Sequence, residues 1–187
     1  MSWAYAFGPA DTPYDDMLAV IQRSYPNYDL EIRNGEYVIV APHDAVSSRL
    51  IVKISAWLET WTSLTKTGHV FESNGGCMFT DGDLMAPDVS FISRTRLPVI
   101  PRSFVHAIPE LVFEIRSSTQ SERATRAKVA LLLAQGVDIA VYIDPGQRVV
   151  EIHRAGAAPL NVPPGGRVEF PDVLPGFGFG VDELWPE

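Results

Sequence analysis

The most constraining part of this sequence is residues 111–143, where two apolar segments flank a helical pattern. Residues 111–116 have the composition of a buried strand, residues 120–135 have helical spacing up to Gly136, and residues 137–143 form a second apolar run. Strand, helix and strand in this order predict a βαβ unit with two parallel strands. Parallel strands are covered on both faces, which explains the nearly unbroken apolar character of the second one. The chain is therefore predicted to be an α/β protein.

A tight turn and a long apolar stripe define the first half of the chain. Asn34 and Gly35 supply the positive φ angles of a two-residue turn, so residues 28–33 and 36–41 are expected to form a β-hairpin. Over residues 45–66, apolar side chains recur every three or four positions, which predicts the longest helix with one buried stripe. The stripe comprises Leu50, Ile51, Ile54, Trp57, Leu58, Trp61 and Leu64.

Turn residues also divide the later strands. Asp81 and Gly82 predict a second hairpin between residues 77–80 and 85–93. Pro87 is expected at the edge or start of its strand, because proline lacks the N–H group that a sheet ladder needs. Two more strands are expected at residues 148–154 and 167–170, and residues 176–180 are expected to be a strand or an extended tail that closes the core. Combined with the parallel pair, the hairpins predict a mixed sheet.

Size and composition indicate one domain that folds alone. The 187 residues are 46% hydrophobic and 20% charged, which is typical of a globular chain. We divide the chain into a lead-in at residues 1–27, with a short helix over residues 13–25, and a single domain at residues 28–187. Cys77 has no second thiol to pair with, so we interpret it as a packing residue. No apolar run approaches the roughly 20 residues that span a bilayer, and we expect a cytoplasmic protein without a membrane partner.

Charge is unevenly distributed along the chain. A net charge of -8 argues against a protein that coats nucleic acid non-specifically, because such affinity comes from Lys and Arg. Between Arg94 and Lys128, however, cations outnumber acids. The cations are Arg94, Arg96, Arg102, Arg116, Arg123, Arg126 and Lys128, and the acids are Glu110, Glu114 and Glu122. This basic segment is suited to contact with a nucleic-acid backbone, and DNA is the expected partner. The ordinary alternative is that these charges form a solvated surface.

Two carboxylates lie in strands that are otherwise apolar. Asp88 begins the apolar run to Ile92, and Glu114 lies inside the strand at residues 111–116. An ionised carboxylate taken out of water is costly unless it is paired, hydrogen-bonded or bound to a cation. In one interpretation Asp88 caps its strand and Glu114 pairs with Arg116, two residues on and on the same face. In the other, both carboxylates bind one Mg²⁺, a hard cation that keeps waters for a substrate phosphate.

The order of several short motifs resembles a nuclease family. Pro87 and Asp88, then Glu114 to Arg116, then Lys128 on the next helix are similar to the PD-(D/E)XK nuclease superfamily. Within it, about residues 28–184 resemble the Uma2 branch (DUF820), a family of restriction-endonuclease-like proteins. Further matching pieces are Asn34-Gly35-Glu36, residues 86–92 and 109–115, Ser117, Gly136-Val137 and Asp144-Pro145. The resemblance implies a restriction-endonuclease-like mixed β-sheet core flanked by helices, with additional β-hairpins.

The resemblance also implies roles for individual residues. Asp88 and Glu114 match ligands of Mg²⁺ or Mn²⁺, and Glu36 would be a third acid, with an exposed hairpin residue as its alternative. Lys128 matches a helix lysine of Uma2-like chains, whose ammonium can orient water and stabilise charge on the phosphate. The alternative for Lys128 is a surface lysine whose stem covers apolar side chains. At the position where the superfamily has lysine, this chain has Arg116, which binds phosphate oxygens but cannot act as a base.

Other positions depart from the family pattern. Ala124 replaces an aspartate four residues before the helix lysine, and Ser47 and Ser48 stand where a histidine is usual ahead of the long helix. The four histidines lack zinc-like spacing and are expected at the surface or in hydrogen bonds. Thr119, with Glu122 three residues on, is interpreted as a helix N-cap.

Two functions therefore stay open. One is a metal-dependent endonuclease that hydrolyses nucleic-acid phosphodiester bonds. The other is a catalytically degenerate nuclease-fold protein that binds nucleic acid or protein. A homodimer also stays open, because the sequence does not determine the oligomeric state.

Overall fold

The computed structural model describes residues 20, 23–24 and 28–186. The lead-in and nearly all of the helix expected at residues 13–25 lie outside these residues. Among the helices that are described, none is long and apolar enough to cross a membrane.

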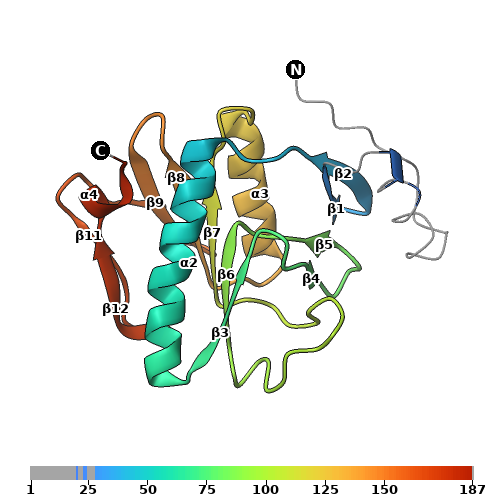
Figure 1. The fold of residues 1–187 in the computed structure, drawn as a ribbon, viewed down its shortest axis with the longest axis horizontal. Coiled ribbons are helices and arrows are strands. Elements are labelled where there is room, and N and C mark those ends of the chain that lie inside the picture. The colour runs from blue at the N-terminus through green and yellow to red at the C-terminus, as the bar shows by residue number, and fades with distance from the viewer. Residues whose placement is uncertain (1–19, 21–22, 25–27, 187) are drawn as a thin grey trace.

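A six-stranded mixed sheet forms the centre of the fold (Figure 1). Its order is β10-β9-β8-β7-β6-β3. The strands are β3 (Gly68–Glu72), β6 (Val89–Ser93), β7 (Leu111–Ile115), β8 (Ile139–Asp144), β9 (Val149–Arg154) and β10 (Leu160–Asn161). β7 and β8 are parallel, and the other neighbouring pairs are antiparallel. Helix α3 (Glu122–Ala134) connects the parallel pair, so the predicted βαβ unit and mixed sheet are confirmed.

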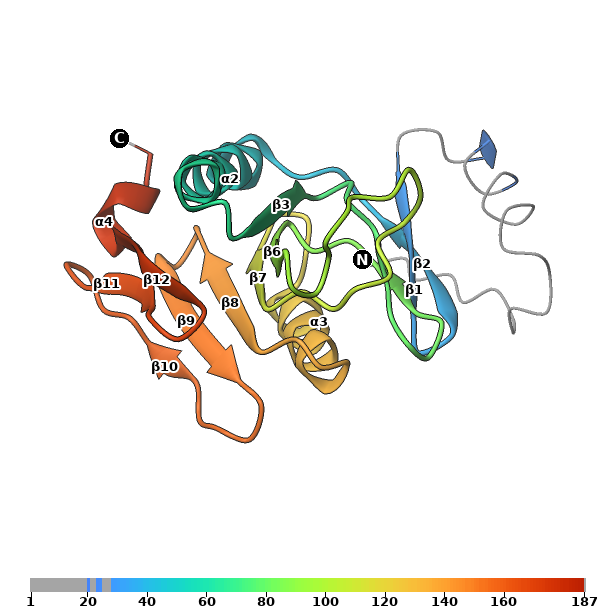
Figure 2. The same cartoon turned by 90° about the horizontal axis from the view of Figure 1, so that it is seen from below.

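The two long helices lie on opposite faces of this sheet (Figure 2). Leu111 and Phe113 of β7 pack in the same core cluster as the buried stripe of α2 (Ala45–Thr65). Val112 packs instead with the buried side chains of α3. Because successive strand residues face opposite sides of a sheet, Glu114 faces α3 together with Val112. The sequence of β7 thus presents a carboxylate to the helix that carries the predicted lysine.

The first of these helices, α2, matches its prediction except at its last turn. It begins at Ala45 and ends at Thr65, with Lys66 as a left-handed C-cap at φ 56°. The stripe is buried or partly buried as far as Trp61, whereas Leu64 is 81% exposed. The assignment of Leu64 to the stripe was wrong, because periodicity does not show where the covered part of a helix ends.

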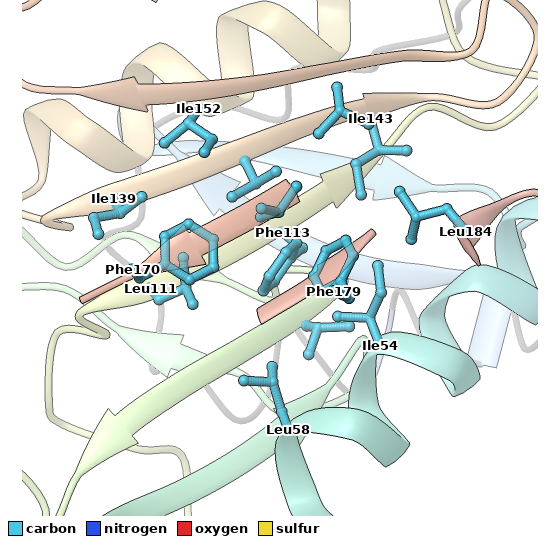
Figure 3. Packing of buried hydrophobic residues seen from close by; sticks show 14 of the residues in the cluster. Ile54, Leu58, Leu111, Phe113, Ile139, Ile143, Ile152, Phe170, Phe179 and Leu184 are labelled. Carbon is cyan, nitrogen blue, oxygen red and sulfur yellow. The ribbon is translucent and has the colours of Figure 1, made fainter. Parts of the chain in front are cut away.

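A C-terminal hairpin closes the core on the α2 side (Figure 3). It consists of β11 (Arg167–Phe170) and β12 (Leu174–Gly180), followed by the short helix α4 (Val181–Leu184). Its phenylalanines pack against Phe113 and against the tryptophans of α2. The strand expected at residues 167–170 is therefore confirmed, and residues 176–180, expected as a strand or an extended tail, belong to a strand.

A smaller sheet lies beside the main one, in the order β2-β1-β5-β4 (Figure 1). Its strands are β1 (Asp29–Arg33), β2 (Glu36–Val40), β4 (Cys77–Met78) and β5 (Leu84–Met85). The turn between β1 and β2 has φ values of 53° at Asn34 and 73° at Gly35, as the hairpin prediction requires. Buried Asp83 accepts hydrogen bonds from the N–H groups of Asn34 (2.6 Å) and Gly35 (2.9 Å), which fastens the hairpin tip to the β4–β5 turn.

The strand predicted over residues 85–93 is in fact two strands. β5 pairs with β4 in the small sheet, and β6 pairs with β3 and β7 in the main sheet. Pro87 lies between them, where its missing N–H costs no ladder hydrogen bond. The break carries the chain from one sheet to the other and leaves Asp88 immediately before β6.

Candidate functional site

Four buried charged side chains meet between the two sheets and α3. They are Glu31 from β1, Asp88 immediately before β6, Glu114 from β7 and Lys128 from α3. Their exposed fractions are 2%, 4%, 3% and 7%. We call this group the Lys128 cluster. The structure thus brings together Asp88, Glu114 and Lys128 and adds Glu31.

Lys128 is held by three oxygen atoms. Its Nζ lies 2.9 Å from Glu31 Oε1 and 3.0 Å from Glu114 Oε1, and it donates a 2.9 Å hydrogen bond to the carbonyl of Ala86. Burial alone would lower the pKa of this lysine, but the negative charges of Glu114 and Glu31 raise it above its ordinary value. Lys128 is therefore a charged ammonium inside the cluster, and not a surface lysine.

Glu31 is the member that sequence reasoning missed. One carboxylate oxygen contacts Lys128, and the other lies 2.6 Å from Arg33 Nε. Burial would raise the pKa of Glu31, but the two cations hold it below its ordinary value. In the sequence Glu31 is one polar residue in an alternating strand, and no local signal connects it with a lysine on α3.

Glu114 is less well compensated than Glu31. Burial raises its pKa well above the ordinary value, Lys128 lowers it in part, and the charges of Asp88 and Glu31 raise it further. Its Oε1 lies near Lys128 but has no hydrogen bond of acceptable geometry. The cluster therefore holds more negative potential than its lysine neutralises.

Asp88 is fixed from two sides. Its Oδ2 accepts a 2.6 Å hydrogen bond from the N–H of Ile115, next to Glu114 in β7. Its Oδ1 lies 3.0 Å from His43 Nε2, and the His43 side chain is 14% exposed. Hydrogen bonding to Asp88 raises the pKa of His43 and outweighs the opposite effect of burial.

His43 was also missed as a site residue. The histidine that is usual ahead of the long helix was expected to be absent, with Ser47 and Ser48 in its region, whereas His43 lies before the helix on the β2–α2 connection. The next residue, Asp44, is the N-cap of α2 and accepts hydrogen bonds from the N–H groups of Ser47 (2.9 Å) and Ser118 (2.6 Å). These bonds fix the connection against the loop after β7 and hold His43 beside Asp88.

Arg116 lies outside the Lys128 cluster. Its Nε and Nη2 contact the two oxygens of Asp144 at 2.7 and 3.0 Å, and its Nη1 donates to the carbonyl of Gln120 at 3.3 Å. The interpretation that Glu114 pairs with Arg116 is therefore wrong. The alternation that placed them on one face stops at Ile115, where β7 ends.

Glu36 is exposed at the start of β2, opposite Arg33 in the hairpin. Among the described residues, the acids that contact Lys128 are Glu31 and Glu114, so Glu36 is not brought into the cluster. The N-cap of α3 is Ser121, whose hydroxyl accepts from the N–H of Ala124, and not Thr119. The capping-box spacing was present, but the helix begins two residues later than expected.

Internal acids neutralise much of the basic segment from Arg94 to Lys128. Four of its cations form ion pairs: Arg96 with Glu110 and Asp138, Arg116 with Asp144, Arg126 with Glu122 and Glu151, and Lys128 within its cluster. Arg94, Arg102 and Arg123 are exposed. A broad positive surface along this segment therefore stays a prediction.

A divalent cation fits the donors of the cluster in a limited way. In the part of the chain that is described, no three His, Cys, Asp or Glu side chains are grouped as a ligand set. Mg²⁺, however, is commonly held by one or two carboxylates and completes its shell with water and phosphate oxygens. Asp88 and Glu114 are two buried carboxylates of this kind; Asp88 already contacts Ile115 and His43, whereas Glu114 Oε1 has no hydrogen bond among the described residues.

Comparison with known proteins identifies the family. The model of the Uma2 family, described as "Putative restriction endonuclease", matches residues 14–182, so the chain belongs to this family. The fold is similar to that of a DUF820 "putative nuclease" from Anabaena variabilis, with a TM-score of 0.73 and 18% identity over 83% of this chain and 89% of that one. No curated protein matches the chain. The expected family and fold class are confirmed.

Proposed function

We propose that the chain is a metal-dependent nuclease that hydrolyses nucleic-acid phosphodiester bonds, DNA in the first place, at the Lys128 cluster. The observation that supports it most is the buried ammonium of Lys128 between Glu31 and Glu114, beside Asp88, in a chain of the Uma2 family. Perturbed, mutually coupled charges of this kind are costly to the fold and are concentrated at functional sites.

Each member of the cluster has a distinct role in this proposal. Asp88 and Glu114 would hold the divalent cation, which when bound supplies a polarised phosphoryl oxygen and a water of lowered pKa. Lys128 would stabilise the charge that develops on the phosphate, and its raised pKa means that it does not act as a base. Glu31 positions Lys128.

The reaction is a hydrolysis in which atoms and charge balance. A water oxygen forms a bond to phosphorus while the bond from phosphorus to the leaving sugar oxygen breaks. The proton that the water loses balances the proton that the leaving oxygen gains. Existing contacts fix the polar groups of the cluster. Glu31 contacts Arg33 and Lys128, Asp88 accepts a hydrogen bond from Ile115, and Lys128 donates one to Ala86. Little reorganisation is therefore needed when charge develops on the phosphate.

A second candidate is a nuclease-fold module that binds nucleic acid or protein without cleaving it. The observation that favours it is the closure of the cluster: Lys128 is 7% exposed and already paired with two carboxylates. The arginine that follows Glu114 is bound to Asp144 and does not reach the cluster.

A cleavage assay separates the two candidates. Single- and double-stranded DNA and RNA are incubated with Mg²⁺ or Mn²⁺ and the wild type, Asp88→Asn or Glu114→Gln. We expect cleavage by the wild type and a loss of at least about 100-fold in the cleavage rate of each variant. Each substitution replaces a carboxylate that would bind the metal with a neutral amide. Glu72→Gln, at the exposed end of β3, is the matched control and should cleave as the wild type does.

Cleavage that survives both substitutions would rule out this site. Binding of nucleic acid by the wild type without cleavage under any of these conditions would favour the second candidate.

A further inference from the structure

We infer that Arg33 binds a phosphate oxygen of the nucleic-acid backbone and is the cation that a substrate meets first at the Lys128 cluster. The inference rests on the proposed function, which it deepens by naming a substrate-positioning residue. It gives Arg33 the role of phosphate contact that the sequence resemblance suggested for Arg116.

The position of Arg33 is the first argument. Its Nε lies 2.6 Å from Glu31 Oε2, so it belongs to the edge of the cluster. Its side chain is 20% exposed, whereas that of Lys128 is 7% exposed. Of the two cations that contact Glu31, Arg33 is therefore the more open to a phosphate in solvent.

The donors that Arg33 leaves over are the second argument. A guanidinium has five N–H groups in a planar fork that matches phosphate oxygens. Among the described residues, the acid that Arg33 contacts is Glu31, and the contact is made through Nε. Within the described part of the chain, the Nη1 and Nη2 end of the fork has no hydrogen-bond partner.

Arg116 provides an internal comparison. Its side chain is 21% exposed, nearly the same as that of Arg33. All three of its nitrogens are occupied, by the two oxygens of Asp144 and by the carbonyl of Gln120. Equal exposure with a different use of donors indicates that Arg116 is a structural arginine and Arg33 is not.

The surroundings hold Arg33 in place before any substrate binds. Glu31 fixes its Nε, and Asp83 fastens the N–H groups of the next two residues, Asn34 and Gly35. Nearby Glu114 and Asp88 add negative charge on the cluster side of the guanidinium. A fixed cation between buried acids and solvent offsets the repulsion that these acids exert on a phosphate.

A salt titration distinguishes a phosphate contact from mere neutralisation of Glu31. Binding of a short DNA duplex is measured by fluorescence anisotropy with Ca²⁺ in place of Mg²⁺, over a series of KCl concentrations. Loss of one phosphate contact reduces the slope of log K against log salt by about 0.9. We expect this reduction in Arg33→Gln and no reduction in Arg116→Gln, the matched control.

Arg33→Lys is the second variant, because it keeps a positive charge beside Glu31 and so protects the fold. Lysine lacks the fork, so affinity should fall about five-fold while the salt slope is retained. Suppose that the wild type cleaves DNA. Wild-type affinity in Arg33→Lys, or an unchanged salt slope in folded Arg33→Gln, would then overturn this inference and leave the proposed function standing. A wild type that neither binds nor cleaves overturns the proposed function and this inference with it.

Discussion

Two charged regions lie beside the parallel strands β7 and β8, and their buried carboxylates are compensated to different extents. In the first, Asp144 at the end of β8 takes both contacts of Arg116 and the N–H groups of Gly146 and Gln147. Every oxygen has donors, and the Arg116 contacts lower the pKa of Asp144 although burial would raise it. In the Lys128 cluster, burial and neighbouring acids raise the pKa of Glu114.

The difference separates a structural ion pair from a candidate site. In the Arg116–Asp144 pair each charge has its complement, so removal of one partner is costly, and all three arginine nitrogens are already occupied. A cluster with surplus acid carries a cost that a bound cation can relieve. Both regions contain a carboxylate and a cation near β7, so sequence proximity alone did not distinguish them.

The largest effect is expected for Lys128→Met. Glu31 and Glu114 would remain buried without their shared cation, and breaking a buried ion pair costs about 3–5 kcal/mol. Urea denaturation measures the free energy of unfolding. The double variant Glu31→Gln with Lys128→Met should recover part of the loss, because it also removes one orphaned charge. A loss below about 1 kcal/mol in the single variant would contradict the description of this cluster.

Arg116→Gln should cost less, about 2 kcal/mol, because Asp144 keeps two backbone N–H donors and the arginine is partly exposed to solvent. Its effect on cleavage should be far smaller than that of Lys128→Met. Both variants are compared by urea denaturation and by the cleavage assay. If the folded Arg116→Gln variant loses cleavage, the distinction between the Arg116 region and the Lys128 cluster is wrong.

Asp44→Ala tests the segment that joins the regions. Asp44 caps α2, binds the loop that follows Arg116, and adjoins His43 at the cluster. Loss of an N-cap costs about 1–2 kcal/mol, which thermal unfolding can detect. Ser121→Ala removes the cap of α3 alone and is the control, with an expected loss of about 1 kcal/mol. Equal losses would show that the bonds from Asp44 to the loop contribute nothing.

The smallest effect is a pH dependence in the Arg116 region. Because the folded pKa of Asp144 is below its ordinary value, its contribution to stability is present above the ordinary pKa of aspartate and is lost as pH falls through the folded pKa. The difference in urea midpoint between the wild type and Asp144→Asn should therefore narrow on acidification from pH about 5 to about 2. A constant difference would show that Asp144 is not held ionised by its partners.

Local sequence patterns predicted the elements that depend on local interactions. The βαβ unit followed from helical spacing that ends at Gly136, which has a φ of 97° in the structure. The first hairpin followed from Asn34 and Gly35. Strands β3 and β10 were not predicted, because a short edge strand has too little apolar alternation to distinguish it from a loop.

The order of the sequence motifs predicted part of the candidate site. Asp88, Glu114 and Lys128 came together, but Glu36 was selected where the structure places Glu31. Glu31 and Lys128 meet through the docking of two sheets, a long-range event that local periodicity does not encode. The Mg²⁺ or Mn²⁺ ion, the homodimer and the cytoplasmic location stay predictions.

The assembly of the cluster from two separately paired sheets has a kinetic consequence. Contacts between distant segments close later than local ones, because the loop between them must first be ordered. The hairpin that carries Glu31 and Arg33 must meet α3 and β7 to complete the cluster, so docking of the two sheets is a long-range step of its own. The fluorescence of Trp57 and Trp61 reports a different long-range step, because these rings pack against Phe179 and Phe177 of β12. A chain in which α2 and β12 have formed the native core can therefore still lack the complete cluster.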